Sequence, residues 1–215
     1  MIHIGPGSAL LLDVAGTLLH PIESVAQVYA RAAGVDLQRV GATVGAAMDE
    51  LRALRSADPG WRAYWAAVVA RATGSDDPRV FEALYSIYAR ADTWAIAPGA
   101  QSLVVDLRAR GVKVGLVSNW DHRLRPLLAE LGVLGWVDVA LVSAEEGIEK
   151  PAPEIFARAC ERLGVDMRNA LMVGDSRPAD VEGARAAGCL ALHFGSDVAD
   201  FHALRELLER PEASA

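Results

Sequence analysis

The chain has 215 residues, which is long enough for one α/β domain with a helical insertion or for two small domains. Hydrophobic residues make up 52% and charged residues 23% of the chain, which excludes a disordered protein apart from the Pro-Glu-Ala-Ser tail. The formal net charge is −7 and no stretch concentrates Lys and Arg into a basic stripe, so a nucleic-acid-binding protein is not expected.

The first predicted element is a strand at residues 9–12, whose four apolar residues are typical of a strand buried on both faces. Asp13 follows at its carboxyl end, and Gly16 and Thr17 then provide a turn and a hydroxyl group. Because ligands bind at the carboxyl ends of strands in open α/β sheets, this stretch indicates a binding site. An ordinary capping Asp is the alternative that these residues alone leave open.

From about residue 21 to residue 97 the pattern changes to helical spacing, which predicts an all-helical insertion. Four amphipathic helices are expected, and together they suggest a small bundle. Their apolar stripes begin near Ile22, Leu37, Trp61 and Val80, with Gly34 ending the first helix and the Asp58-Pro59-Gly60 turn ending the second. The aromatic side chains of Trp61, Tyr64 and Trp65 are expected in the bundle core, with a substrate pocket as the alternative.

After Pro98 and Gly99, strands and helices alternate along the chain. The predicted elements are a helix at 100–110, a strand at 112–117, a helix at 124–131, a strand at 137–142, a polar loop at 143–147, a helix that begins near Pro153, a strand at 170–173, a loop at 174–180, a helix at 181–187, a strand at 190–194 and a helix at 199–208. With the first strand, this order predicts a doubly wound α/β sheet of five strands.

Polar side chains follow several of these strands. Ser118 and Asn119 come after the second strand, and Asp175 and Asp180 come after the fourth. If the first and fourth strands are neighbours, at least one of these carboxylates lies beside Asp13, and such a cluster needs a proton or a cation. Hard oxygen ligands without His or Cys point to Mg²⁺.

Lys150 stands out because only two of the 21 basic residues are lysines, the other being Lys113. A compact ammonium group on a flexible stem suits a point contact to a phosphate or a carboxylate. A solvated loop lysine is the alternative on this residue alone.

In their order and spacing, four stretches resemble the motifs of the haloacid dehalogenase (HAD) superfamily, whose members use an aspartate nucleophile on a Rossmann-like sheet. The stretches are residues 13–17, Ser118, residues 150–154 and residues 174–180. Residues 118–121, Ser-Asn-Trp-Asp, are similar to a branch of mostly uncharacterised hydrolases and phosphatases.

The insertion resembles the helical cap of one HAD subfamily. The resemblance therefore implies a Rossmann-like catalytic core formed by residues 1–20 and 98–215, and a helical-bundle cap at residues 21–97.

The resemblance also implies a role for each motif residue. Asp13 would attack phosphorus, and Mg²⁺ would be held by Asp13, the backbone carbonyl of Ala15 and Asp175. Asp180 would orient a water molecule on the metal. These roles agree with the physical need to offset repulsion between a phosphate dianion and an anionic nucleophile.

The resemblance further implies which residues would bind the phosphoryl group. Ser118 and Lys150 would hold its oxygens together with nearby backbone N–H groups, with Asn119 and Thr17 as further substrate-binding residues. The aspartyl phosphate would then be hydrolysed by water.

One departure from the family pattern bears on catalysis. The phosphatases carry a second Asp two residues after the nucleophile, which protonates the leaving oxygen, and this chain has Ala15 there. Losing such an acid typically costs a factor of about 10² to 10⁴ in rate. His20 is the nearest replacement in sequence, although a hinge residue before Pro21 is the preferred interpretation. Ala152 also replaces a frequent Asp of the third motif, a milder change because Lys150 remains.

Two relatives that also lack this acid are the dehalogenases and the phosphonoacetaldehyde hydrolases. Dehalogenases work without a metal, whereas Asp175 and Asp180 preserve a metal site here. Phosphonoacetaldehyde hydrolases need a cap lysine for a Schiff base, and residues 21–97 contain none.

The sequence thus predicts a Mg²⁺-dependent phosphatase that acts on a small phosphorylated metabolite and is slow toward poor leaving groups. A non-catalytic member that binds a phospho-ligand or a protein partner is the alternative, and a 2-haloacid dehalogenase is a further one. Neither nucleic acid nor membrane is an expected partner, and the protein is expected to be a monomer or a homodimer.

A cytoplasmic location is expected from the cysteines and from the absence of targeting signals. Cys160 and Cys189 fit no metal spacing and lie among apolar or small residues, as buried free thiols do. No stretch reaches the roughly 18 apolar residues of a membrane span, and no basic region precedes the apolar run near the N-terminus.

Overall fold

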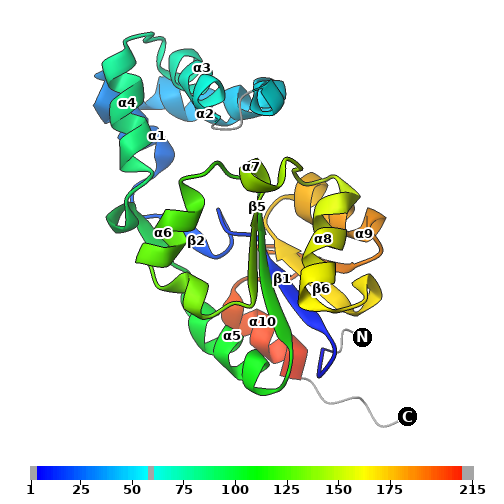
Figure 1. The fold of residues 1–215 in the computed structure, drawn as a ribbon. Coiled ribbons are helices and arrows are strands. Elements are labelled where there is room, and N and C mark those ends of the chain that lie inside the picture. The colour runs from blue at the N-terminus through cyan, green and yellow to red at the C-terminus, as the bar shows by residue number, and fades with distance from the viewer. Residues whose placement is uncertain (1–3, 58–60, 210–215) are drawn as a thin grey trace. The chain divides into compact units, whose positions relative to one another are not determined.

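The computed structural model describes residues 4–57 and 61–209 (Figure 1). The expected turn at residues 58–60 and the Pro-Glu-Ala-Ser tail lie outside the described residues. The chain divides into two compact units. We call them the core unit, formed by the described residues of 1–20, 96–119 and 132–215, and the helical unit, formed by those of 21–95 and 120–131.

The core unit contains a parallel five-stranded sheet with the order β5-β4-β1-β6-β7. Its strands are β1 (Ala9–Leu12), β4 (Lys113–Ser118), β5 (Val139–Val142), β6 (Ala170–Gly174) and β7 (Leu190–His193). The predicted Rossmann-like sheet is therefore confirmed. All four residues of β1 and all five of β6 are buried, because parallel strands in such sheets are covered on both faces.

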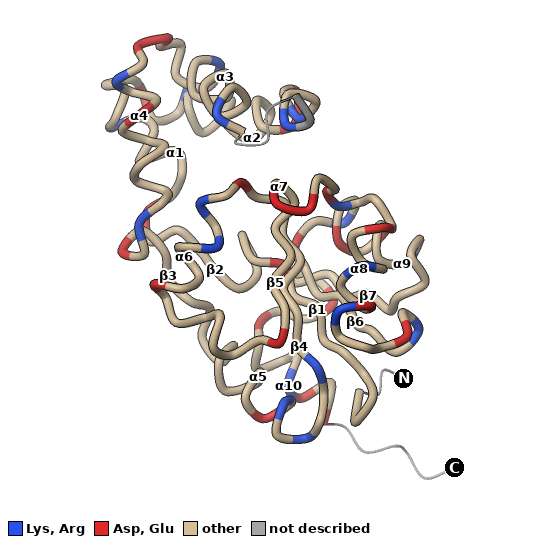
Figure 2. The backbone as a smooth tube through the Cα atoms, in the orientation of Figure 1, with Lys and Arg blue, Asp and Glu red and all other residues tan. Residues whose placement is uncertain are grey.

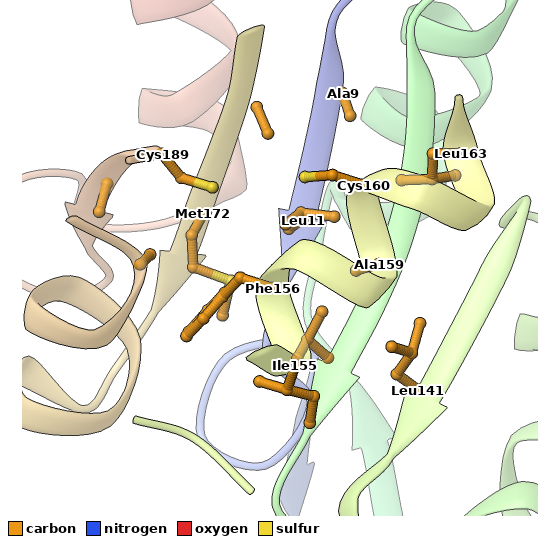
Figure 3. Close-up of a cluster of buried hydrophobic side chains, with 14 of the residues drawn as sticks. Ala9, Leu11, Leu141, Ile155, Phe156, Ala159, Cys160, Leu163, Met172 and Cys189 are labelled. Carbon is orange, nitrogen blue, oxygen red and sulfur yellow. The ribbon is translucent and has the colours of Figure 1, made fainter. Parts of the chain in front are cut away.

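Helices cover the two faces of this sheet, with α8 and α9 on one side and α5 and α10 on the other (Figure 1). They are α5 (Ala100–Ala109), α8 (Pro153–Leu163), α9 (Gly183–Ala186) and α10 (Phe201–Glu209). Figure 3 shows the apolar side of α8, including Phe156 and Cys160, packed over Leu11 and Met172 of the sheet. Cys160 and Cys189 are buried free thiols, as expected.

The helical unit contains the four expected helices. They are α1 (Val25–Ala33), α2 (Leu37–Glu50), α3 (Arg62–Thr73) and α4 (Pro78–Ile87), and a 3₁₀ helix (Arg52–Ala57) follows α2. Ser24 caps α1 by accepting a hydrogen bond from the Gln27 amide, and Gly34 ends it in the left-handed conformation. Trp61 and Tyr64 are buried and Trp65 is half-buried. This confirms the expectation that the aromatic cluster is largely core.

Segment 120–131, which carries α6 (Leu124–Glu130), groups with the helical unit although the sequence placed it with the core. Its anchor is the buried carboxylate of Asp121, which accepts a hydrogen bond from Trp65 Nε1 at 2.8 Å. Arg123 pairs with the same carboxylate at 2.6 Å and donates to the Tyr85 carbonyl at 2.7 Å. These contacts join α6 to α3 and α4.

Three short elements differ from the sequence expectation. The insertion is not entirely helical, because β3 (Trp94–Ile96) pairs with β2 (Leu19–Pro21). The expected polar loop at 143–147 contains α7 (Ser143–Glu146), a single helical turn that ends at left-handed Gly147. Further along, a π-helical turn (Arg177–Glu182) occupies part of the expected loop at 174–180.

Three 3₁₀ helices complete the fold: Ala91–Thr93, Val133–Gly135 and Met167–Asn169. Among the described residues, no helix has the length and apolar character that a membrane crossing requires.

Candidate active site

The carboxyl end of β1 places Asp13 between the ends of two other strands. Leu12 pairs with Leu116 of β4 on one side and with Val173 of β6 on the other. The Asp13 amide continues this register by donating to the Val173 carbonyl at 3.0 Å. Ser118 and Asp175 therefore come from the two neighbouring strand ends, as the sequence predicted on the condition that the first and fourth strands pair.

Lys150 lies between two carboxylates at this edge of the sheet. Its Nζ is 2.6 Å from Oδ1 of Asp13 and 2.6 Å from Oδ1 of Asp180. The exposed fractions are 2% for Lys150, 6% for Asp13 and 1% for Asp180, so the three charges are shielded from solvent. The structure therefore excludes the solvated-loop interpretation of Lys150.

The second oxygen of Asp180 is also held. Oδ2 accepts a hydrogen bond from the Ser176 amide at 2.9 Å. Ser176 caps the π-helical turn, and its side chain accepts from the Ala179 amide at 3.3 Å. The turn thus brings Asp180 back toward the end of β6. The sequence did not indicate the hydrogen bond between Asp180 and the Ser176 amide.

Asp13, Asp175 and Asp180 can each direct one carboxylate oxygen so that all three oxygens lie within 4.8 Å of one another. Burial raises the pKa of Asp13 to about 7, opposed by Lys150 and reinforced by Asp180. The pKa of Asp175 is also raised, first by burial and then by the charge of Asp180. Three hard oxygen donors this close together fit a divalent cation such as Mg²⁺.

Two glycines let the backbone approach these carboxylates. A Cβ atom on Gly16 would lie 2.2 Å from Oδ2 of Asp175, and the φ angle of +84° is also one that glycine favours. A Cβ atom on Gly174 would lie 2.3 Å from Cγ of Asp180. A side chain at either position would displace an acidic group of the cluster.

Burial places Ser118 and Thr17 in the interior of the core unit. Ser118 is the last residue of β4 and is 1% exposed, while Thr17 is 0% exposed. The Thr17 hydroxyl has no hydrogen-bond partner among residues 4–57 and 61–209. Their expected contacts to a phosphoryl group stay predictions.

The side-chain amide of Asn119 forms hydrogen bonds with the protein backbone. Its Nδ2 donates to the Lys150 carbonyl at 2.8 Å, and its Oδ1 accepts from the Lys150 amide at 2.7 Å. The sequence predicted a substrate contact here and gave no signal for this pairing, because the two residues are 31 positions apart.

Ala15 is exposed, two residues beyond Asp13, and offers no acidic side chain to the site. His20 is half-buried and lies in β2, the last residue of the core unit before the chain enters the helical unit. The hinge interpretation of His20 and its use in place of the missing acid both stay predictions.

The model of a protein family described as haloacid dehalogenase-like hydrolase matches residues 8–188. Haloacid dehalogenase-like hydrolase domain-containing protein 3 of Homo sapiens is 30% identical over 197 residues, covering 83% of this chain and 78% of that protein. The protein of the same name from Mus musculus is 36% identical over 134 residues, which are 59% of this chain and 53% of the relative. The chain thus spans about half the length of the mouse relative in that match.

A phosphoserine phosphatase of Thermus thermophilus is 32% identical over 120 residues, covering 55% of this chain and 48% of that protein. Among solved structures, a HAD phosphatase from Thermococcus onnurineus is similar with a TM-score of 0.64 and 26% identity, covering 94% of this chain and 98% of that one. A dehalogenase solved with an intermediate complex has a TM-score of 0.77 at 21% identity over 97% of this chain and 100% of that one, a likeness of fold alone.

Proposed function

Because the chain belongs to the haloacid dehalogenase-like hydrolase family, we propose that it is a Mg²⁺-dependent phosphatase that works through an aspartyl phosphate on Asp13. The observation that carries this proposal is the position of the Lys150 ammonium, 2.6 Å from both Asp13 and Asp180 in a buried site. Relatives named as phosphatases, such as the Thermus phosphoserine phosphatase, support a small phosphorylated substrate.

In this proposal, Asp13 and Asp175 hold Mg²⁺ together with the backbone carbonyl of Ala15, and Asp180 lies close enough to contribute. When bound, the metal supplies positive charge that offsets the repulsion between the phosphoryl oxygens and the carboxylates. Removing the metal should therefore abolish turnover.

The chain's own residues carry the two chemical steps. One oxygen of Asp13 attacks phosphorus, the bond from phosphorus to the leaving oxygen breaks, and the leaving group departs with the electron pair. Lys150 and Ser118 stabilise the transferring phosphoryl oxygens. Water then attacks the aspartyl phosphate, which releases phosphate and restores the Asp13 carboxylate.

Without an acid at position 15, the departing oxygen must leave as an anion or take its proton from another group. Phosphates with good leaving groups, such as acyl and aryl phosphates, should therefore be better substrates than alkyl phosphates. The choice among natural substrates is proposed to depend on the insertion at residues 21–97, in the role of a cap.

A 2-haloacid dehalogenase is the second candidate, because a halide leaves without a proton and Ala15 is then no handicap. The three carboxylates favour the phosphatase, since displacement of halide by Asp13 needs no metal. A non-catalytic protein that binds a phospho-ligand could use the same residues, so turnover is the observation that distinguishes it from the phosphatase.

The deciding experiment measures phosphate release from a panel of phosphorylated metabolites, acetyl phosphate and p-nitrophenyl phosphate, with Mg²⁺ and with EDTA. Halide release from 2-chloropropionate is measured in parallel. We expect Mg²⁺-dependent phosphate release, fastest with the activated substrates. Halide release in EDTA would identify a dehalogenase, and no turnover in either assay would support the non-catalytic alternative.

A further inference from the structure

The side chain of Asn119 and the backbone of Lys150 form a closed pair of hydrogen bonds within the core unit. The asparagine Nδ2 donates to the Lys150 carbonyl at 2.8 Å, and its Oδ1 accepts from the Lys150 amide at 2.7 Å. A carboxamide presents a donor and an acceptor side by side, like a peptide group of a neighbouring strand. Asp and Ser cannot reproduce this pair. A carboxylate has no hydrogen-bond donor, and a hydroxyl has a single oxygen atom, which cannot meet the amide and the carbonyl of Lys150 side by side.

Lys150 needs such a partner because it lies in a turn, outside the helices and strands that would satisfy its backbone groups. Asn119 is the first residue after β4, so its backbone is fixed by the sheet. The pair therefore connects the turn that carries the Lys150 ammonium to the end of β4, at the edge of the sheet beside Asp13.

The same turn is supported from another side by α9. A Cβ atom on Gly183 would lie 2.8 Å from the Cα atom of Pro151, so the helix backbone approaches this turn closely. A lysine side chain has a long flexible stem and loses considerable rotamer freedom when its ammonium is fixed. When the backbone at Lys150 and Pro151 is fixed, the lysine side chain starts from one position. Fewer of its rotamers then need to be searched to bring Nζ to the two carboxylates.

We propose that Asn119 is a positioning residue, which sets the Lys150 ammonium beside Asp13 through the Lys150 backbone instead of contacting the substrate. Its consequence for catalysis rests on the proposed phosphatase function. Its structural part, the support of the Lys150 turn by the Asn119 amide, stands independently of that function.

The test uses Asn119→Ala, which removes both hydrogen bonds, and the nearly isosteric Asn119→Asp, which keeps the acceptor and loses the donor. The chain has only one other asparagine, Asn169, which is exposed and ends a 3₁₀ helix at the amino end of β6. Asn169→Ala is therefore a matched control, far along the strand from the carboxyl edge of the sheet. Should Asn119→Ala fail to fold, the similarly sized Asn119→Leu, which also removes both hydrogen bonds, replaces it in every arm.

The first readout is hydrogen exchange of the Lys150 backbone amide by NMR, with no substrate present. We expect slow exchange in the wild-type protein and in the control, and clearly faster exchange in Asn119→Ala. The same rate in Asn119→Ala as in the wild-type protein would overturn the proposal, whether or not the protein is a phosphatase.

The second readout is a double-mutant cycle with Lys150→Ala, using kcat/KM for p-nitrophenyl phosphate and the Kd of inorganic phosphate, both with Mg²⁺. Asn119→Ala alone should lower kcat/KM by a factor on the order of 10 to 100, as misplacement of a catalytic group does. Added to Lys150→Ala, it should cause no further loss in either quantity, because it acts only through Lys150.

A full, multiplicative loss in the Lys150→Ala background would overturn the proposal and identify Asn119 as a direct substrate contact. Failure of the phosphatase function gives a different result. In that case the wild-type protein releases no phosphate from any substrate, while the hydrogen-exchange readout still decides whether Asn119 holds the Lys150 turn.

Discussion

Asp13, the proposed nucleophile, is a buried carboxyl group, and its charge is balanced by the Lys150 ammonium 2.6 Å away. Although burial lowers the pKa of Lys150, the charges of Asp13 and Asp180 outweigh it and raise that pKa overall. The ammonium group therefore stays charged beside Asp13. A carboxyl group with a raised pKa is itself costly to ionise in the fold.

Asp13→Asn should abolish phosphate release while the protein stays folded. The amide is nearly isosteric with the carboxyl group but is not a nucleophile, and Lys150 keeps its contact with Asp180. We expect turnover below detection and a melting temperature within a few degrees of wild type, measured by phosphate release and thermal unfolding. Turnover retained in a pure preparation would remove Asp13 from its assigned role.

Ala15→Asp should restore the missing acid and act selectively on difficult substrates. An alkoxide leaves poorly without a proton, whereas nitrophenolate needs little help. The ratio of kcat/KM for an alkyl phosphate to that for p-nitrophenyl phosphate should therefore rise, by a factor of about 10 or more. The comparison is made at saturating Mg²⁺, which must offset the added charge near Asp13 and Asp175. An unchanged ratio in a folded, metal-binding variant would mean that the proton already comes from another group.

At the scale of elements, the sequence predicts best where one short stretch decides the structure. β1 and β6 are uninterrupted apolar runs, and each ends at the polar residue that the site needs. α1 follows from its apolar spacing and the glycine that ends it, and α8 from a proline in its first turn. These signals are local, so the elements can be predicted without knowing which other segments of the chain they contact.

The sequence predicts less where contacts join distant residues. β3 has only three residues and forms by pairing with β2, which lies far away along the chain. The sequence predicts a loop where the π-helical turn carries Asp180, because Ser176 is followed by Arg, Pro and Ala without an apolar stripe. The grouping of α6 with the helical unit depends on Asp121, whose partners lie on other helices.

Gly183 in α9 tests whether the close approach of this helix to the Lys150 turn matters. Gly183→Ala places a Cβ atom 2.8 Å from a backbone atom of Pro151, so either the helix or the turn must move. We expect a loss of about 1 to 3 kcal/mol in the free energy of unfolding, as overpacking causes, and a loss of about tenfold or more in kcat/KM.

The matched control is Gly45→Ala in α2, where a Cβ atom would meet nothing within 4 Å. This change should stabilise the protein by about 0.4 to 1 kcal/mol and leave activity unchanged. The two variants are compared by urea unfolding and by p-nitrophenyl phosphate hydrolysis. Equal activity in the two would show that the Lys150 turn tolerates displacement by α9.

At the scale of the whole molecule, acidic and basic residues are interspersed along both units, and Figure 2 shows no continuous basic stretch in the part of the chain it describes. With a net charge of −7, the protein as a whole repels an anionic substrate. Binding must therefore depend on local positive charge at the candidate site, which Lys150 and a divalent cation would supply together.

The same site should make the stability of the whole molecule depend on pH and Mg²⁺ together. The pKa of Asp13 is about 7 in the folded protein, against an ordinary value of 3.8, chiefly because of burial. The folded protein thus holds this proton more tightly than the unfolded chain. The contribution of Asp13 to the free energy of unfolding is therefore full in acid and is lost as the pH rises from about 4 through about 7.

Mg²⁺ should reverse this trend, because it competes with the proton for the ionised carboxylate. We expect saturating Mg²⁺ to raise the melting temperature more at about pH 8 than at about pH 5, with each kcal/mol worth about 2 to 4 °C in a chain of this size. Thermal unfolding with EDTA and with Mg²⁺ at the two pH values measures the difference. Asp13→Asn is the control, since it removes the titrating group and should remove most of the pH dependence of the Mg²⁺ effect. The same Mg²⁺ shift at both pH values in the wild-type protein would mean that the ion does not bind at Asp13.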